Sequence, residues 1–194
     1  MAERPGDGAD GVRVGDQVGR RLRQLRTGQG LSLSELARRS GVGKGTLSEL
    51  EGGRRNPTVE TLYAVTTALG LPLSSALADL SPTSGRPDPD RPTGLSGSAV
   101  TVVLQERFED AAAVTEVYRM LIRAGAVQES AAHIPGTEER VVVLAGTARL
   151  GPVDRPLTVD PGAQGHWLSD GPHLYAAPDG DVDAVLFIRY PRRP

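Results

Sequence analysis

The sequence predicts a two-domain protein, with an all-helical N-terminal bundle followed by an all-β domain built as a sandwich or barrel. Residues 16–80 place apolar side chains at helical spacing, and glycines punctuate the segments. Residues 99–194 contain short runs of valine, leucine and isoleucine separated by glycine, proline and aspartate, which is typical of antiparallel strands joined by tight turns. Between them, residues 81–98 hold four prolines and three glycines, so we expect a linker there.

Five helices are expected in the N-terminal domain. The first covers Asp16–Thr27. The second begins after Ser32, whose hydroxyl can form a capping box with Glu35, and it stops at Gly41. The remaining three helices are expected from Gly43 or Lys44 to Gly52, from Thr58 to Gly70, and over Leu73–Leu80.

Five strands are expected after the linker. They are Ala99–Leu104, Val114–Ile122, Arg140–Leu144, Thr147–Leu150 and Ala184–Tyr190. Tyr118, Tyr175 and Phe187 fall at strand positions, where we expect them in the core. His166 and the single tryptophan, Trp167, are expected as a packing pair at a strand edge.

Composition excludes several classes of protein. There is no cysteine, which removes disulfides, thiol catalysis and zinc–thiolate sites. No apolar run is long enough to span a bilayer, and the first residues lack the apolar core of a secretory signal, so we expect a soluble cytoplasmic protein with a disordered tail over residues 1–15. Residues 11–80 carry a net charge of +4 and residues 81–194 a net charge of −4, so a polyanion would meet the N-terminal domain.

The stretch LSLSELARRSGVGKGTLSELEGGRRNP at residues 31–57 resembles the lambda-repressor-like helix-turn-helix family, also called the XRE or Cro/C1 type. The resemblance extends over roughly Val18–Leu77. It implies a five-helix DNA-binding domain whose second motif helix enters the major groove. Gly41 permits the tight turn between the two motif helices. The resemblance also implies a structural ion pair between Arg26 and Glu51.

The resemblance places a set of side chains at the DNA. Lys44, Gly45, Thr46 and Glu49 lie where this family contacts base edges, with Ser48 beside them. Lys44 is the only lysine in the chain and can donate to guanine. Gly45 departs from the family pattern because it has no side chain, and Glu49 departs too, since it can either accept from cytosine or repel phosphate.

Arg54 and Arg55 are expected to bind phosphate, together with backbone amides at helix N-termini. The complete set of expected DNA contacts is Ser32, Lys44, Gly45, Thr46, Ser48, Glu49, Arg54, Arg55 and Asn56. Four further arginines are interpreted as a solvated face: Arg20, Arg21, Arg38 and Arg39. Tandem helices of this shape also occur as protein-interaction modules, and that alternative stays open.

Residues 99–194 resemble the cupin family, a small double-stranded β-barrel often fused behind this type of DNA-binding domain. The resemblance is carried by His133–Glu139, Val141–Gly146, Val159–Gly162 and Asp170–His173. It implies an all-β cupin-like barrel that acts as a sensor or dimerisation domain.

Metal-binding cupins use a His-x-His pair, a glutamate and a later histidine. Here His133, Glu139 and His173 match, but either Pro135 or Ala131 stands where a fourth ligand would be. We therefore expect no cofactor and no catalytic residue, and a pocket for a small molecule bordered by the three matching residues. If a divalent metal binds, these three are its expected ligands.

Together these features predict a bacterial, sequence-specific transcriptional regulator. We expect a homodimer that binds a palindromic operator in double-stranded DNA, responds to a small-molecule effector and does not contact a membrane. Two alternatives are kept: a metal-dependent cupin enzyme, such as an isomerase or oxygenase, fused to a DNA-binding domain, and a helix-turn-helix protein-interaction module.

Overall fold

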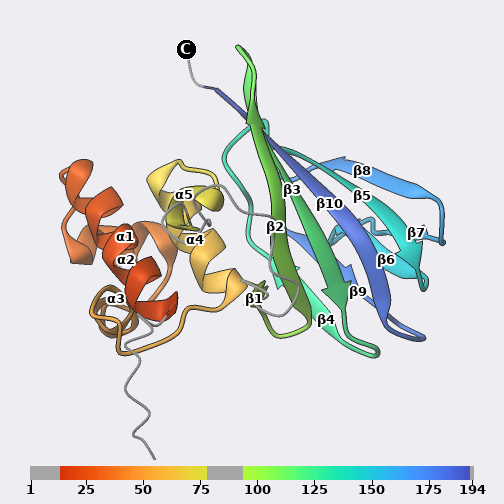
Figure 1. The fold of residues 1–194 in the computed structure, drawn as a ribbon, viewed down its shortest axis with the longest axis horizontal. Coiled ribbons are helices and arrows are strands. Elements are labelled where there is room, and N and C mark those ends of the chain that lie inside the picture. Colours follow the sequence, from red (N-terminus) through yellow and green to blue (C-terminus); the bar gives the residue numbers. More distant parts are fainter. Residues whose placement is uncertain (1–13, 78–93, 193–194) are drawn as a thin grey trace, which may run out of the picture.

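The computed structural model describes residues 14–77 and 94–192. The helices form one domain (the helical domain, residues 14–77), which lies beside a domain of strands (the β domain, residues 94–192; Figure 1). The expected order of a helical domain followed by a strand-rich domain is confirmed. Most of the expected tail and of the expected linker lies outside the described residues.

The five helices are α1 (Val14–Gly28), α2 (Leu33–Ser40), α3 (Lys44–Glu51), α4 (Val59–Leu69) and α5 (Ser74–Leu77). Helix α1 begins two residues earlier than expected, inside the segment assigned to the tail. The last three residues of the expected fifth helix fall outside the described part of the chain.

Helix boundaries follow the capping signals in the sequence. The Ser32 hydroxyl accepts a hydrogen bond from the Glu35 amide at 3.1 Å, and the Thr58 hydroxyl accepts one from the Thr61 amide at 3.3 Å. At the other ends, Gly41 and Gly70 both adopt φ of 69°, the left-handed conformation that glycine enters without a steric cost. These caps fix where α2 and α4 begin and end.

An ion pair joins α1 to the end of α3. The Arg26 guanidinium donates from Nε and Nη2 to the two carboxylate oxygens of Glu51, at 2.7 and 2.8 Å, and from Nη1 to the Leu31 carbonyl at 2.7 Å. Both side chains are largely buried, so this two-pronged contact is shielded from solvent. It confirms the expected structural pair and sets the position of α3 relative to α1.

The β domain contains strands β1 (Gly94–Ser96), β2 (Val100–Glu109), β3 (Ala113–Ile122), β4 (Val127–Ser130), β5 (Glu138–Ala145), β6 (Ala148–Pro152), β7 (Leu157–Val159), β8 (Gln164–Leu168), β9 (His173–Ala176) and β10 (Val182–Pro191). The five expected strands overlap β2, β3, β5, β6 and β10. Strand β1 lies inside the segment that was expected to be a linker, where it pairs with β2 in antiparallel register.

The strands form two antiparallel sheets, one in the order β1-β2-β3-β10-β5-β8 and the other in the order β4-β9-β6-β7. Along β10, buried residues alternate with half-buried ones, as expected for a strand with one face on the core. The hydrogen-bond ladders of the described strands make two separate sheets, so closure into a barrel stays a prediction.

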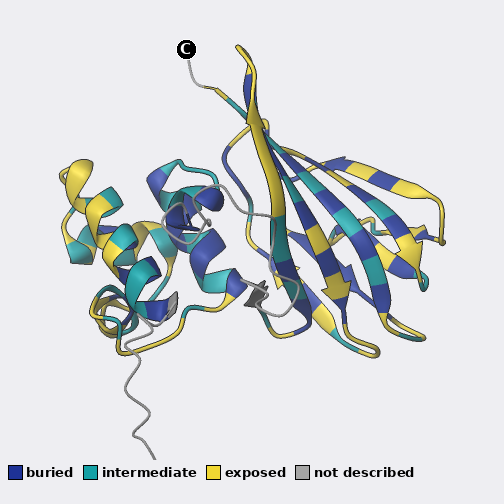
Figure 2. Cartoon of the chain, viewed as in Figure 1, coloured by how far each residue is buried: buried dark blue, intermediate teal, exposed yellow. Residues whose placement is uncertain are grey.

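The two domains share one continuous core (Figure 2). Helix α4 lies beside β2, and Tyr63 and Leu73 of the helical domain join Tyr118 and Ile134 of the β domain in the same cluster of buried side chains. Polar contacts cross the same boundary. The Ser74 amide donates to the Glu116 carboxylate at 3.1 Å.

A second polar contact lies at the start of α4. Glu60 accepts hydrogen bonds from the Ser98 amide at 2.7 Å and from the Ser98 hydroxyl at 3.1 Å. Burial alone would raise the pKa of Glu60, but these hydrogen bonds hold it below its ordinary value. The helical domain is therefore attached to the β domain through α4 and the start of α5.

Candidate nucleic-acid interface and buried ligand site

Ser32, one of the residues expected at DNA, caps the N-terminus of α2, and the other expected residues lie on α3 and just after it. All but one of the expected contact residues are exposed, and Thr46 is half-buried. Lys44 is the first residue of α3, and the preceding Gly43 provides no side-chain cap, so the helix N-terminus is left for an outside partner. At this end of α3, which would enter a groove of DNA, no side chain of the N-cap residue occupies the backbone amides.

Gly45 is not required by packing within the chain. A Cβ atom built on it would meet no heavy atom within 4 Å, and its φ is not in the left-handed region. The glycine therefore leaves bare backbone on the exposed side of α3, where another molecule can approach closely.

Glu49 and Arg55 form an exposed ion pair with 3.5 Å between Arg55 Nη1 and Glu49 Oε2. Such pairs contribute less than about 1 kcal/mol, so Arg55 can exchange this partner for a phosphate at little cost. Asn56 has a structural neighbour as well, because its side-chain oxygen lies where a Cβ on Gly15 would be. Asn56 thus packs against the start of α1.

Two of the arginines interpreted as a solvated face have partners on their own helix. Arg38 and Arg39 each lie 2.7 Å from Glu35 of α2. Their hydrogen bonds lower the pKa of the half-buried Glu35 to about 2. This pairing fits the interpretation of Arg38 and Arg39 as a solvated face.

The β domain brings together the three residues expected to border a pocket. His133 comes from the loop between β4 and β5, Glu139 from β5 and His173 from the first position of β9. The three residues are 4%, 0% and 1% exposed, and their candidate ligand atoms all lie within 4.8 Å of one another. We call these three residues the His–Glu–His cluster.

Distances within the cluster are short, yet the atoms lack aligned hydrogen bonds. Glu139 Oε1 lies 2.6 Å from His133 Nε2 and 3.3 Å from His173 Nε2. Even so, none of these three buried atoms has a hydrogen bond of acceptable geometry among the described residues. The three ligand atoms therefore converge in space without being joined by aligned hydrogen bonds.

The backbone sets the orientation of His173. Its Nδ1 lies 3.0 Å from the Gly171 carbonyl oxygen, which can only accept, so Nδ1 carries the proton of that hydrogen bond. In the neutral ring, Nε2 then presents a lone pair to the Glu139 carboxylate, a repulsive arrangement that a proton or a cation would relieve.

Electrostatics in the cluster follow the same logic. Burial alone would raise the pKa of Glu139, but His173 and His133 outweigh it and hold that pKa well below its usual range. Burial alone would lower the pKa of His173, but the Glu139 carboxylate raises it above its ordinary value. The cluster therefore holds a buried carboxylate, and a positive charge beside that carboxylate would stabilise it.

Aromatic side chains enclose the cluster. The ring centroids of Tyr63 and Tyr190 lie 4.9 and 6.2 Å from that of His133, and the Trp167 centroid lies 6.4 Å from that of His173. The Tyr175 hydroxyl donates to Glu139 Oε2. Sequence reasoning missed this enclosure: Tyr175 is buried, as expected, but it also packs around the cluster. The expected packing pair of His166 and Trp167 is wrong, because neighbouring residues of β8 face opposite sides of the sheet, so that Trp167 is buried beside the cluster and His166 is exposed.

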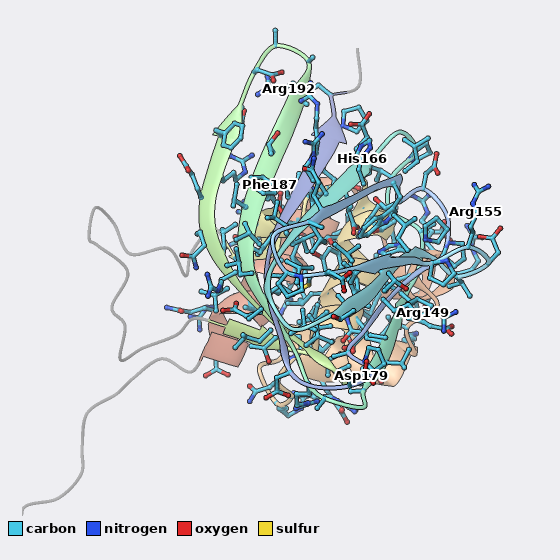
Figure 3. All side chains as sticks on the ribbon, turned by 90° about the vertical axis from the view of Figure 1, so that its right-hand side faces the viewer. Arg149, Arg155, His166, Asp179, Phe187 and Arg192 are labelled. Atoms are coloured by element: carbon cyan, nitrogen blue, oxygen red, sulfur yellow. The ribbon has the colours of Figure 1, made fainter. Side chains whose placement is uncertain are left out.

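Tyr63 belongs to the helical domain, and no signal in the sequence links it to His133. Phe187 was expected in the core, and this expectation is wrong. It is half-buried, because odd-numbered residues of β10 face away from the core, and it lies on the side of the β domain turned away from the helices (Figure 3).

The donor set fits a divalent transition metal ion. Two imidazole nitrogens and one carboxylate oxygen converge, and their unpartnered state is what a ligand set without its ion would show. Pro135 and Ala131 are both exposed, so neither lies at the buried cluster. His166, the third histidine of the chain, is exposed beside Glu138 and lies outside the cluster.

Comparison with known proteins decides the family. Residues 22–75 match the Helix-turn-helix family HTH_3, which is the XRE type. Over 175 residues the chain is 32% identical to the HTH-type transcriptional regulator SutR of Escherichia coli K12, and the match covers 88% of this chain and 93% of SutR. The chain belongs to the HTH-type transcriptional regulators. The expected DNA-binding transcriptional regulator is thereby confirmed.

One solved structure is similar over most of the chain and another over about half of it. An HTH_3 family transcriptional regulator from Vibrio cholerae superposes with a TM-score of 0.78 at 25% identity, covering 92% of this regulator and 98% of that chain. The Cupin_2 domain of an XRE family regulator from Enterobacter cloacae gives a TM-score of 0.44 at 25% identity, covering 48% of this chain and 99% of that domain. Among the described residues, no helix combines the length and the apolar character that a bilayer span requires.

Replacing Arg54 and Arg55 of this regulator by alanine should weaken binding to every duplex. Each lost phosphate contact should lower the slope of log affinity against log salt concentration by about 1, because fewer counterions are released. Fluorescence anisotropy across a salt series measures the slope. Arg38→Ala is the control, since Arg38 already pairs with Glu35. An unchanged slope in the double variant would remove both arginines from the interface.

In the same assay, Lys44→Ala should instead relax the preference at one base pair by about 1–3 kcal/mol, if Lys44 donates directly to guanine. Equal losses on selected and random duplexes would show that Lys44 contacts phosphate alone.

Proposed function

We propose that the regulator binds a palindromic operator as a homodimer, with an affinity set by a ligand held at the His–Glu–His cluster. One observation carries this proposal: three buried ligand atoms converge without aligned partners in a domain that packs directly on the DNA-binding helices. A regulator with such a site has a means of linking its occupancy to the position of its helices.

The geometry favours a divalent metal ion over a larger organic effector. The ligand atoms lie within 4.8 Å of one another, and each of the three side chains is less than 5% exposed. An ion bound there would supply positive charge beside Glu139 and would tie β5 to β9 and to the loop that carries His133. The Gly171 carbonyl would hold His173 in the tautomer that binds metal.

We propose no catalytic role for the β domain. The side chains of Tyr63, Trp167, Tyr175 and Tyr190 pack around the cluster, and each of its three residues is less than 5% exposed, which argues against a site open to a substrate. The regulators among the relatives support the same view.

The outer face of the larger sheet supports the homodimer. Its apolar side chains include Val117, Leu121, Val142, Leu144, Val185 and Phe187, all half-buried or exposed. A shallow hollow of about 420 Å³ lies on this face and is bordered by Arg140, His166 and Phe187. Apolar side chains on an exposed sheet face are typical of a surface that pairs with a second copy, and a two-fold operator needs two DNA-binding domains.

Removing divalent metal ions should change the affinity of the full-length protein for DNA by about fivefold or more, and adding Co²⁺, Ni²⁺, Zn²⁺ or Mn²⁺ back should reverse the change. The DNA is a duplex selected from random sequence by the protein itself. His173→Ala should abolish the response and leave metal-free binding intact, because the contacts given for the His173 ring are with the cluster, the aromatic rings around it and the Gly171 carbonyl, all within the β domain.

His166→Ala is the matched control for that experiment. It also removes a histidine, but an exposed one that pairs with Glu138, so the metal response should persist. Equal DNA affinity with chelator and with every ion tested would reject the ion as the ligand.

Phe187→Glu should convert the dimer to a monomer, because it places a charge in the centre of the apolar outer face. Sedimentation velocity measures the state, and binding to two half-sites should weaken while binding to one half-site is kept. Arg155→Glu, exposed on the turn between β6 and β7, is the control. A wild-type monomer at concentrations that saturate a palindrome would contradict the dimer.

A further inference from the structure

We propose that Tyr63 of the helical domain is the fourth member of the buried ligand site, so that the site is shared between the two domains. Its hydroxyl would contact the bound ion, directly or through a water on that ion. This inference rests on the proposed function and adds to it the route by which the ligand acts on the DNA-binding helices.

The position of Tyr63 supports this role. It lies on α4, and its ring centroid is 4.9 Å from that of His133 with the two planes tilted by 52°. The side chain is 8% exposed, and its hydroxyl is buried without a hydrogen-bond partner among the described residues. A buried hydroxyl left unpaired costs about 1–3 kcal/mol, whereas phenylalanine would fill the same space at no such cost. Residues 14–77 and 94–192 give this hydroxyl no hydrogen-bond partner, so a bound ligand would be the group that pairs with it.

The three cluster residues alone do not complete the coordination of a divalent ion. Two histidines and one carboxylate leave open positions in the coordination of a divalent ion. Pro135 and Ala131, the positions from which a fourth ligand was sought in the sequence, are both exposed. The aromatic ring nearest to His133 comes instead from the other domain.

Contacts on either side of Tyr63 make α4 a suitable transmitter. One turn earlier, Glu60 is bonded to Ser98, and after the helix the Ser74 amide is bonded to Glu116. Leu62, next to Tyr63, is fully buried in the core that also contains Leu36 of α2 and Leu47 of α3. A shift of Tyr63 would therefore be felt by the two motif helices through close-packed side chains.

Tyr190 provides a matched comparison. Its hydroxyl is also buried without a partner among the described residues, and its ring is 6.2 Å from that of His133. Its ring comes from β10 and not from α4, although its hydroxyl approaches the backbone of Leu73 in the helical domain. Removing its hydroxyl therefore makes the same chemical change at the same domain boundary but leaves α4 unchanged.

The test compares Tyr63→Phe with Tyr190→Phe in the full-length protein, with Co²⁺ as the probe. Trp167 is the only tryptophan and lies 6.4 Å from His173, so quenching of its fluorescence reports Co²⁺ binding directly. Tyr63→Phe should weaken Co²⁺ binding about tenfold and should bring the effect of Co²⁺ on DNA affinity close to none. DNA affinity without metal should be unchanged, and Tyr190→Phe should behave as wild type.

Three results would overturn the inference. The first is a Tyr63→Phe variant that keeps both the Co²⁺ affinity and the Co²⁺ effect on DNA. The second is an equal loss in Tyr190→Phe, which would make the hydroxyls interchangeable. The third is weaker DNA binding by metal-free Tyr63→Phe, which would assign Tyr63 to the fold of the helical domain.

Failure of the proposed function itself is distinguishable. In that case the wild-type protein shows no quenching by Co²⁺, or quenching without any change in DNA affinity, and this inference falls with it. A wild-type response that Tyr63→Phe retains overturns the role of Tyr63 alone.

Discussion

Burial of Glu116 between the domains is the constraint on which the arrangement depends. This carboxyl group is fully buried and accepts hydrogen bonds from the Ser74 amide and the Tyr118 hydroxyl, while burial raises its pKa. A buried carboxyl group without such partners costs several kcal/mol. Undocking the helical domain would remove the Ser74 amide from Glu116, and it would also expose Tyr63 and Leu73. The docked arrangement is therefore held by a polar contact as well as by a shared core.

This docking gives the His–Glu–His cluster a physical connection to DNA binding. A ligand changes the affinity for DNA only to the extent that it binds one arrangement of the domains more tightly than another. A site buried entirely within the β domain would lack that difference, because its contacts would be the same in every arrangement. Tyr63 against His133 makes the environment of the cluster depend on where α4 lies. The exposed face of α3 belongs to the same helical domain, on the helix that directly precedes α4 in the chain.

The sequence predicted local features well and long-range ones poorly. Ser32, Thr58, Gly41 and Gly70 marked the ends of helices because capping depends on near neighbours, and the three cluster residues were found through a family motif. Strands β4, β7, β8 and β9 have three to five residues each, too few for a clear alternating pattern.

The contact of Tyr63 with His133 joins positions 70 residues apart, and the unpaired hydroxyl of Tyr63 appears only when both domains are in place. Hydrogen exchange of the full-length protein, compared with Co²⁺ and with chelator, tests this central link most directly. Binding at the cluster should slow exchange in β5 and β9 and also in α4, because Tyr63 would then be held by the ion. Slower exchange confined to β5 and β9, with α4 unchanged, would contradict a site shared between the domains.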